Sequence, residues 1–192
     1  MPMKRGMRNK AMYKESINLL QQHGVCFESG LTSAEIKRAE AIYNIHFPKC
    51  LCDFLMQALP VSKGYYNWRD VTEKNIDYIK QVIEKPVNDL CSVAEDMEWR
   101  DEWGIEPKTK SEKIKRIKER VKCAPQMIPV FCHRYMPAVD TEEAPILSIH
   151  GTDIIYYGEN LTDYIEVELG EKHQEGINFQ NIMKLPFWSD LM

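Results

Sequence analysis

Long apolar runs are absent from this sequence of 192 residues. No segment approaches the about 18 consecutive apolar residues that a membrane-spanning helix requires. The basic N-terminal segment, MPMKRGMRNKAMYKES, is not followed by the apolar stretch that a secretory signal contains. We therefore expect a cytoplasmic protein that does not bind a membrane.

Catalytic signatures that depend on glycine are also absent. The sequence has 9 glycines, each separated from the others, and contains no G-x-S-x-G, Walker or G-x-G-x-x-G motif. The histidines do not form the H-E-x-x-H pattern of a zinc protease. These absences argue against the common routes to nucleotide binding and hydrolysis, and we expect no cofactor, no metal and no catalytic residue.

Disulfide bonds are not needed in a chain of this length, which can bury a sufficient apolar core. The six cysteines are Cys26, Cys50, Cys52, Cys91, Cys123 and Cys132. Most lie within apolar patterns, so we expect reduced thiols. Cys50 and Cys52 are two positions apart in a predicted helix and point away from each other, which makes a metal or redox pair a poor interpretation. Cys132 and His133 are neighbours on a predicted strand and project to opposite faces, so they do not form a catalytic pair.

Charge is distributed unevenly around a net value of −4. Residues 108–122 hold eight Lys and Arg against two Glu, whereas residues 95–106 hold six acidic residues against one Arg. From residue 133 to the end there are eleven Asp and Glu against three Lys and Arg. A predominantly acidic surface argues against nucleic acid and favours a basic protein as partner.

Helical patterns dominate the first two thirds of the chain. Residues 10–23 read as a helix, and Thr32 with Glu35 forms a capping box that starts the next one. A helix over residues 72–84 is expected to end at Pro86. From Pro125 the chain changes to short β-branched and aromatic runs. This order predicts an α+β fold with a small, mostly antiparallel sheet packed against the N-terminal helices.

The segment ILSIHGTDIIYYGENL predicts a β-hairpin with Gly151 and Thr152 in its turn. His150 would then face Asp153, as a structural pair across the strands. The alternative is a metal site, for which His133 would supply the third ligand.

Aromatic residues beside acidic ones, in segments typical of loops, have the composition of an interface. These residues are Tyr65, Tyr66, Trp68, Asp70, Glu98, Trp99, Asp101 and Trp103. An equally open interpretation is that the aromatic rings cover the edge of the core. The mixed face of the β-hairpin, with His150, Asp153 and Tyr157, is a second candidate for partner contact.

Two segments together resemble the SUKH superfamily, which includes bacterial immunity proteins and relatives of fungal cell-wall assembly regulators. The segments are GLTSAEIKRAEAIYNIHFPKCLCDFL and IPVFCHRYMPAVDTEEAPILSIHGTDIIYYGENLTDYIEVELG with the final PFWSDL, so the resemblance covers roughly residues 25–60 and 127–190. The sequence departs from the family pattern at Phe47-Pro48, and LPVSKGYYNWRD replaces the usual glycine-rich turn. The resemblance implies an N-terminal arm and first helix (1–24) and a single SUKH-like domain (25–192) with a helical insertion at about 70–122.

The resemblance also implies a function. The leading hypothesis is a non-enzymatic immunity protein that neutralises a bacterial toxin, often a nuclease, by binding its cognate toxin domain directly. The alternative is a regulatory scaffold that binds a cellular partner. A lesser alternative is a metal-dependent hydrolase that uses His133, His150 and Asp153. Both a monomer and a homodimer, paired through a sheet edge, are compatible with the sequence.

Overall fold

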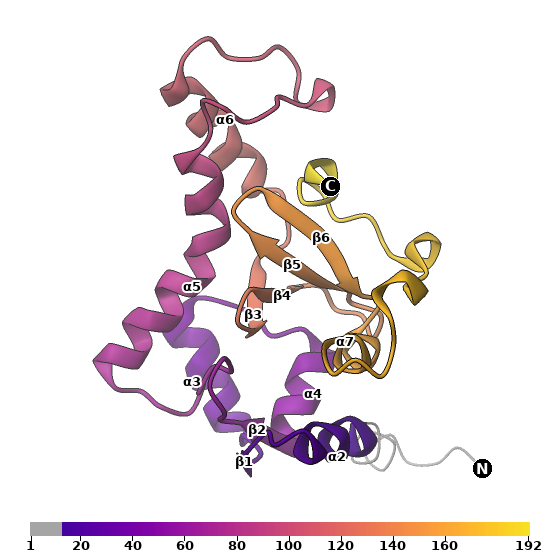
Figure 1. The fold of residues 1–192 in the computed structure, drawn as a ribbon. Helices are drawn as coiled ribbons and strands as arrows, with labels where there is room; N and C mark the ends of the chain where they lie inside the picture. The colour runs from indigo at the N-terminus through magenta and orange to yellow at the C-terminus, as the bar shows by residue number, and fades with distance from the viewer. Residues whose placement is uncertain (1–12) are drawn as a thin grey trace, which may run out of the picture.

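Residues 13–192 are described by a computed structural model, which Figure 1 shows as a ribbon. The helices are α2 (Lys14–Gln22), α3 (Ser33–Tyr43), α4 (Lys49–Gln57), α5 (Glu73–Ser92), α6 (Lys110–Val121) and α7 (Leu161–Glu168). The strands are β1 (Phe27–Ser29), β2 (Ala58–Pro60), β3 (Met127–Phe131), β4 (Arg134–Pro137), β5 (Ile146–His150) and β6 (Asp153–Gly158). This order confirms the α+β class. The N-terminal arm predicted before residue 13 lies outside the described residues.

The main sheet has four antiparallel strands in the order β3-β4-β5-β6, and β1 pairs with β2 in a second, smaller sheet. The β5–β6 hairpin has the predicted register, with His150 opposite Asp153 and Ile149 opposite Ile154. Gly151 has a φ of 65°, which suits the first central position of a type II′ turn. The turn chemistry therefore fixes which side chains share a face.

Each face of the main sheet contributes to a hydrophobic core. One face contributes Ile128, Met136 and Ile146 to a core formed with the N-terminal helices and α7. The opposite face contributes to a second core, with Met127, Tyr135, Leu147, Ile149 and Ile154. Side chains alternate along a strand, so neighbouring residues such as Ile146 and Leu147 supply different cores. The sheet is consequently a middle layer between two sets of covering elements.

The α5–α6 segment, which we call the helical hairpin (residues 73–121), covers this second face (Figure 1). Leu90 of α5 and Ile117 of α6 are both 0% exposed and belong to the second core. The segment predicted as an insertion is thus a structural layer of the domain.

The predicted helix break at Pro86 is wrong, because α5 runs through this residue. A proline inside a helix leaves the carbonyl four residues earlier without its usual N–H donor. That carbonyl belongs to Val82, and the hydroxyl of Tyr135 on β4 donates to it at 3.1 Å. A contact between α5 and the sheet therefore compensates for the missing hydrogen bond.

The C-terminal tail, with the segment PFWSDL, packs on the same core. Trp188 is 2% exposed, and its Nε1–H donates to the carbonyl of Pro125 at 3.0 Å. Phe187 stacks on Trp103 with ring centroids 5.3 Å apart, and Trp103 Nε1–H donates to Asp190. The tail therefore fastens the helical hairpin to the start of β3.

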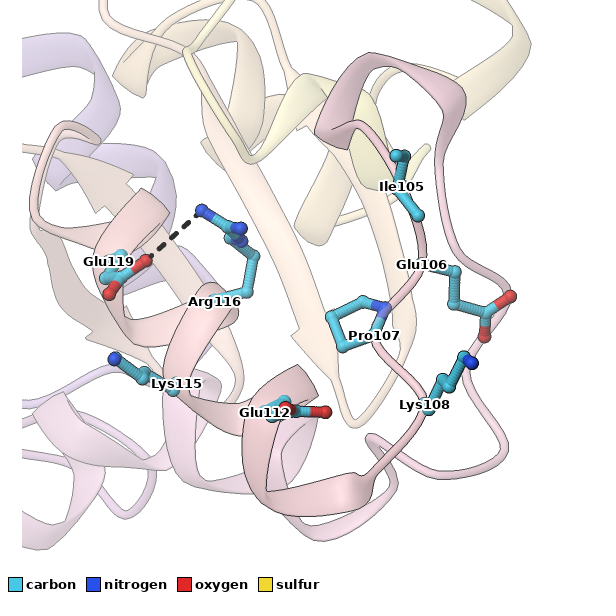
Figure 2. Close-up of a pocket in the computed structure, with 8 residues that line it drawn as sticks. All are labelled: Ile105, Glu106, Pro107, Lys108, Glu112, Lys115, Arg116 and Glu119. Carbon is cyan, nitrogen blue, oxygen red and sulfur yellow. Dashed lines mark ion pairs between the residues drawn. The ribbon is translucent and has the colours of Figure 1, made fainter.

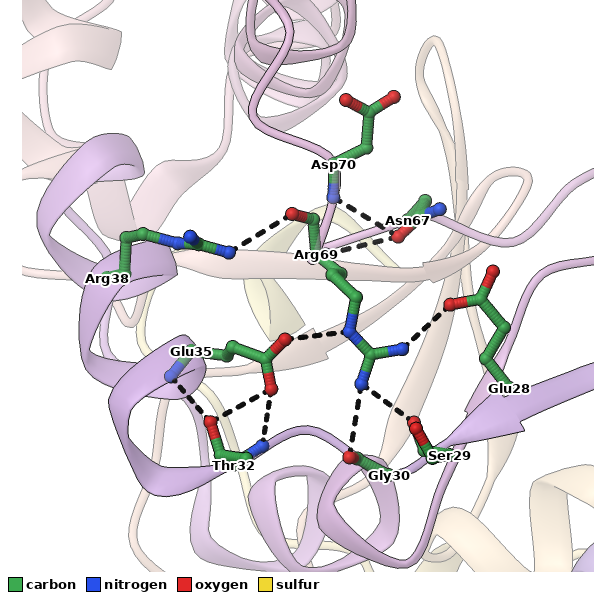
Figure 3. A network of polar contacts seen from close by, with 9 residues as sticks. All are labelled: Glu28, Ser29, Gly30, Thr32, Glu35, Arg38, Asn67, Arg69 and Asp70. Atoms are coloured by element: carbon green, nitrogen blue, oxygen red, sulfur yellow. Dashed lines mark hydrogen bonds and ion pairs between the residues drawn. The ribbon is translucent and has the colours of Figure 1, made fainter.

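A polar network centred on Arg69 joins the loop before α5 to the start of α3 (Figure 3). The capping box of Thr32 and Glu35 is present as predicted. The Arg69 guanidinium donates to Glu35 and to Glu28, both at 2.7 Å, and to the carbonyls of Ser29 and Gly30. Hydrogen bonds from Arg69 and Thr32 lower the pKa of Glu35 to about 2. One side chain thus joins the loop before α5 to residues 28–35, a stretch that is distant in sequence.

We expect Arg69→Met to lower the free energy of unfolding by about 1–3 kcal/mol near neutral pH, because charge-assisted hydrogen bonds are lost. The folded-state pKa of Glu35 is depressed below its ordinary value of 4.5. The stabilisation from the ionised Glu35 carboxylate is therefore present above pH 4.5 and is lost as the pH falls towards 2. Denaturant unfolding at several pH values should show that the difference in unfolding free energy between Arg69→Met and wild type becomes smaller in acid. Lys37→Met, a change at an exposed position of α3, is the control. If both substitutions lowered the unfolding free energy equally, the stabilising role of the Arg69 hydrogen bonds would be contradicted.

Candidate functional site

Three aromatic residues of the predicted contact surface lie in the core. Tyr66 and Trp68 are each 3% exposed and Trp103 is 4% exposed. The ring of Trp68 packs edge-on against Phe47 at 4.9 Å, and the Tyr66 hydroxyl donates to the carbonyl of Cys132. These rings offer no surface to a partner, so we correct the predicted surface by removing them. Tyr66 and Trp68 lie in a loop and Trp103 ends the 3-10 helix Asp101–Trp103, and all three side chains close the edge of the core.

Tyr65 and Asp70 also have structural partners. Tyr65 forms an isolated β-bridge with Phe131, and their ring centroids are 4.7 Å apart. Burial raises the pKa of Tyr65. Asp70 accepts a hydrogen bond from the backbone N–H of Thr72, the residue before α5. Both residues therefore shape the loop that leads into the helical hairpin.

The mixed face of the β-hairpin is partly open. His150 and Asp153 are exposed, whereas Tyr157 is half-buried beneath Arg134, whose guanidinium carbon lies 3.7 Å from the ring centroid. The ring centroids of His133 and His150 are 5.7 Å apart. Even so, no group of three or more His, Cys, Asp and Glu side chains within residues 13–192 is arranged to hold a metal ion. The geometry gives no support to the metal-dependent hydrolase.

Arg134 is the charged centre of this face and is itself buried, at 8% exposure. Its guanidinium donates to Glu168 of α7 at 3.0 Å and to the hydroxyl of Ser148 on β5 at 2.9 Å. Burying a cation is costly unless partners such as these replace its lost hydration. The cluster joins α7 to the sheet.

A hollow of about 450 Å³ lies where the helical hairpin meets the turn of the β-hairpin. We call it the acidic hollow; its lining residues are Leu90, Val93, Asp96, Met97, Glu98, Arg100, Thr152 and Leu191. Four of the eight lining residues are apolar: Leu90 and Leu191 are buried, Met97 is half-buried and Val93 is 36% exposed. Asp96 and Glu98 are exposed at its border.

The charges at this border are largely available to a partner. Glu98 has an 82% exposed side chain and lies 3.5 Å from Arg100, a loose ion pair. The Nε of Arg100 is buried and has no hydrogen-bond partner within residues 13–192. Asp153 is exposed and follows Thr152 in the turn, so a third carboxylate lies next to the lining residues. Apolar lining side chains beside exposed carboxylates suit a protein surface that carries an apolar side chain among basic ones.

The remaining predicted residues, Trp99 and Asp101, continue the same loop. Trp99 is half-buried and its Nε1–H donates to the carbonyl of Gly104, while Asp101 is exposed. Sequence reasoning identified Glu98, Trp99 and Asp101 but missed Val93 and Met97. Val93 and Met97 follow α5, which ends at Ser92, and the backbone N–H of Met97 donates to the carbonyl of Val93 at 3.0 Å. Their spacing of four residues was the available signal, because it brings two apolar side chains together on one helical turn.

Comparison with models of known protein families, with curated proteins and with solved structures finds no match. Within the described part of the chain, no helix combines the length and apolar character needed to cross a membrane.

We expect His133 to make the protein less stable in mild acid. Burial lowers the pKa of His133 below its ordinary 6.5, Arg134 and His150 lower it further, and Glu168 and Asp153 partly oppose them. Below pH 6.5 the unfolded chain binds the proton more readily, so stability falls until the pH passes the lowered folded-state pKa. His133→Gln should flatten this part of the curve of unfolding free energy against pH. His173→Gln, a change at an exposed position, is the control and should leave the curve as in wild type. If His133→Gln also left the wild-type curve unchanged, this assignment would be contradicted.

Proposed function

We propose that this chain is a non-enzymatic protein-binding domain of the immunity type, which neutralises a toxin domain by docking on it through the acidic hollow. The observation that carries the proposal is the combination of the partly exposed apolar side chains of Val93 and Met97 with the exposed carboxylates of Asp96 and Glu98 in the lining of one hollow. Such a surface is suited to recognition, because the apolar part supplies contact area and the charges select the partner.

The charge of the chain supports a basic partner. The net charge is −4, and the acidic residues are concentrated in residues 95–106 and in the part of the chain after residue 133. The acidic hollow lies where these two regions meet, since Thr152 belongs to the second. Opposite potentials accelerate the encounter of two proteins and disfavour partners of the same sign. A toxin domain that acts on nucleic acid carries positive charge on its working face.

The resemblance to the SUKH superfamily supports neutralisation as the purpose of this binding. Both segments that carry the resemblance contribute to the layers of the domain: the first forms α3 and α4, and the second forms the four-stranded sheet and α7. The proposed contact residues are Asp96, Glu98, Trp99, Asp101, His150 and Asp153.

Reversing the two border charges tests this proposal. We expect Asp96→Lys with Glu98→Lys to weaken binding of the natural partner by about tenfold or more, because attraction is replaced by repulsion. The tagged full-length protein is isolated from its native cells at low and moderate salt, and mass spectrometry identifies and quantifies what accompanies it. Wild type should retain one stoichiometric basic protein, and the variant should lose it.

The matched control is Asp77→Lys with Glu84→Lys, which makes the same charge change at exposed positions of α5 away from the hollow. This variant should retain the partner. If both variants retained the partner equally, the assigned surface would be contradicted. If wild type retained a set of substoichiometric acidic proteins in place of one basic partner, the proposed function would be contradicted.

A further inference from the structure

A second acidic surface lies beside the point where the described part of the chain begins. It is a hollow of about 390 Å³, which we call the α7 hollow, and it shares no lining residue with the acidic hollow. Tyr13 forms part of its lining, and its charged lining residues are Glu142, Glu143, Asp163 and Glu166. All four are carboxylates, so the hollow attracts positive charge.

A hollow at the end of the helical hairpin has no such preference. There the exposed Ile105 stands beside a lining that carries three carboxylates and three cations (Figure 2). Mixed charges of this kind do not select the sign of a partner. In the α7 hollow every charge of the lining has the same sign, so the lining itself states what kind of group it favours.

Two carboxylates of the α7 hollow lack a cationic partner within residues 13–192. Glu142 and Asp163 each pair with a lysine. Glu143 is exposed and accepts a hydrogen bond from the neutral side-chain amide of Asn160 at 3.0 Å. Glu166 is half-buried on α7. Glu143 and Glu166 therefore keep a negative charge that no neighbouring cation in this part of the chain offsets.

Tyr13 fixes the point from which the preceding segment leaves. Its side chain is 2% exposed and packs edge-on against Phe54 of α4, with ring centroids 5.7 Å apart. Burial raises the pKa of Tyr13, and the negative charges of Glu142 and Glu143 raise it further. The backbone that precedes Tyr13 thus starts at the border of the α7 hollow, within the field of its carboxylates.

The segment before Tyr13 has the opposite charge. Residues 1–12, MPMKRGMRNKAM, contain four Lys and Arg and no Asp or Glu. An extended chain advances by at most about 3.5 Å per residue, so the backbones of Lys10 and Arg8 stay within about 11 and 18 Å of Tyr13. These two cations are therefore confined to the neighbourhood of the α7 hollow.

We propose that residues 4–10 dock on the α7 hollow of their own chain, where Lys10 and Arg8 lie against Glu143 and Glu166. The covalent connection at Tyr13 gives the segment a high effective concentration at this surface. The docked segment joins the start of α2 to α7 and covers the second acidic surface. This contact is independent of the proposed function, but it leaves the acidic hollow as the open acidic surface for a basic partner.

Carbodiimide coupling of the full-length protein at low salt tests the contact, because the reagent joins a lysine amine to a carboxylate that touches it. An equal mixture of isotopically labelled and unlabelled protein separates bonds within one copy from bonds between two copies in the mass spectrum. We expect Lys10 or Lys4 to be joined to Glu143 or Glu166 of the same copy, and high salt to reduce this product.

The ion pair of Lys49 with Glu142, at 2.8 Å, is the internal positive control. Coupling of this pair without coupling of Lys4 or Lys10 to the α7 hollow would overturn the proposal. So would coupling of the two N-terminal lysines only to the hollow of a second copy, or equally to a distant carboxylate such as Glu84.

Exchange of the two sets of charges provides a second measurement. Glu143→Lys with Glu166→Lys should lower the denaturant midpoint of unfolding at low salt, and so should Arg8→Glu with Lys10→Glu. In the variant that combines all four substitutions the exchanged charges attract again, so about half or more of the summed loss should be recovered.

The matched control combines the same N-terminal reversal with Asp77→Lys and Glu84→Lys, which are exposed positions of α5. This combination should recover nothing. Strictly additive losses in the variant with all four exchanged charges, or an equal recovery in the control, would contradict docking on the α7 hollow.

Discussion

The burial of the four-stranded sheet on both faces is the constraint on which the rest of the structure depends. Along β3, β4 and β5, neighbouring side chains alternate between two cores, so both faces require a cover. The N-terminal helices and α7 provide one cover, and the helical hairpin with the C-terminal tail provides the other (Figure 1). Removing either would expose a continuous apolar surface.

This constraint also creates the candidate site. The helical hairpin must lie against the sheet to bury Leu90 and Ile117, and this position brings the loop after α5 to the turn of the β5–β6 hairpin. Leu191 completes the acidic hollow from the opposite end of the chain, because the tail is fixed by Trp188. The same packing directs the end of the helical hairpin away from the body, where Ile105 is exposed. Two different surfaces thus follow from one packing requirement.

The features that were predictable from the sequence are those determined by local interactions. The capping box at Thr32 and the register of the β-hairpin depend on residues close together in the chain, and both are confirmed. Pro86 was misread because its compensating donor, Tyr135, lies 49 positions away in the sequence. Tyr66 and Trp68 were indistinguishable from exposed aromatic residues for the same reason, since distant segments bury them. The acidic hollow joins three separate segments. The loop and the end of the β-hairpin were predicted separately as contact surfaces, but their proximity and the part played by Leu191 depend on tertiary packing.

Hydrogen exchange of the full-length protein under native conditions, read by mass spectrometry, tests this account most directly. If the helical hairpin is a covering layer of the sheet, the amides of α5 around Leu90 and those of α6 around Ile117 should exchange through the same cooperative opening as β5. Their opening free energies should then agree and should fall together when Trp188 is replaced by Ala. Fast exchange of α5 and α6 beside a protected β5 would contradict the account, because the helical hairpin would then be an independent appendage and the acidic hollow would have no fixed shape.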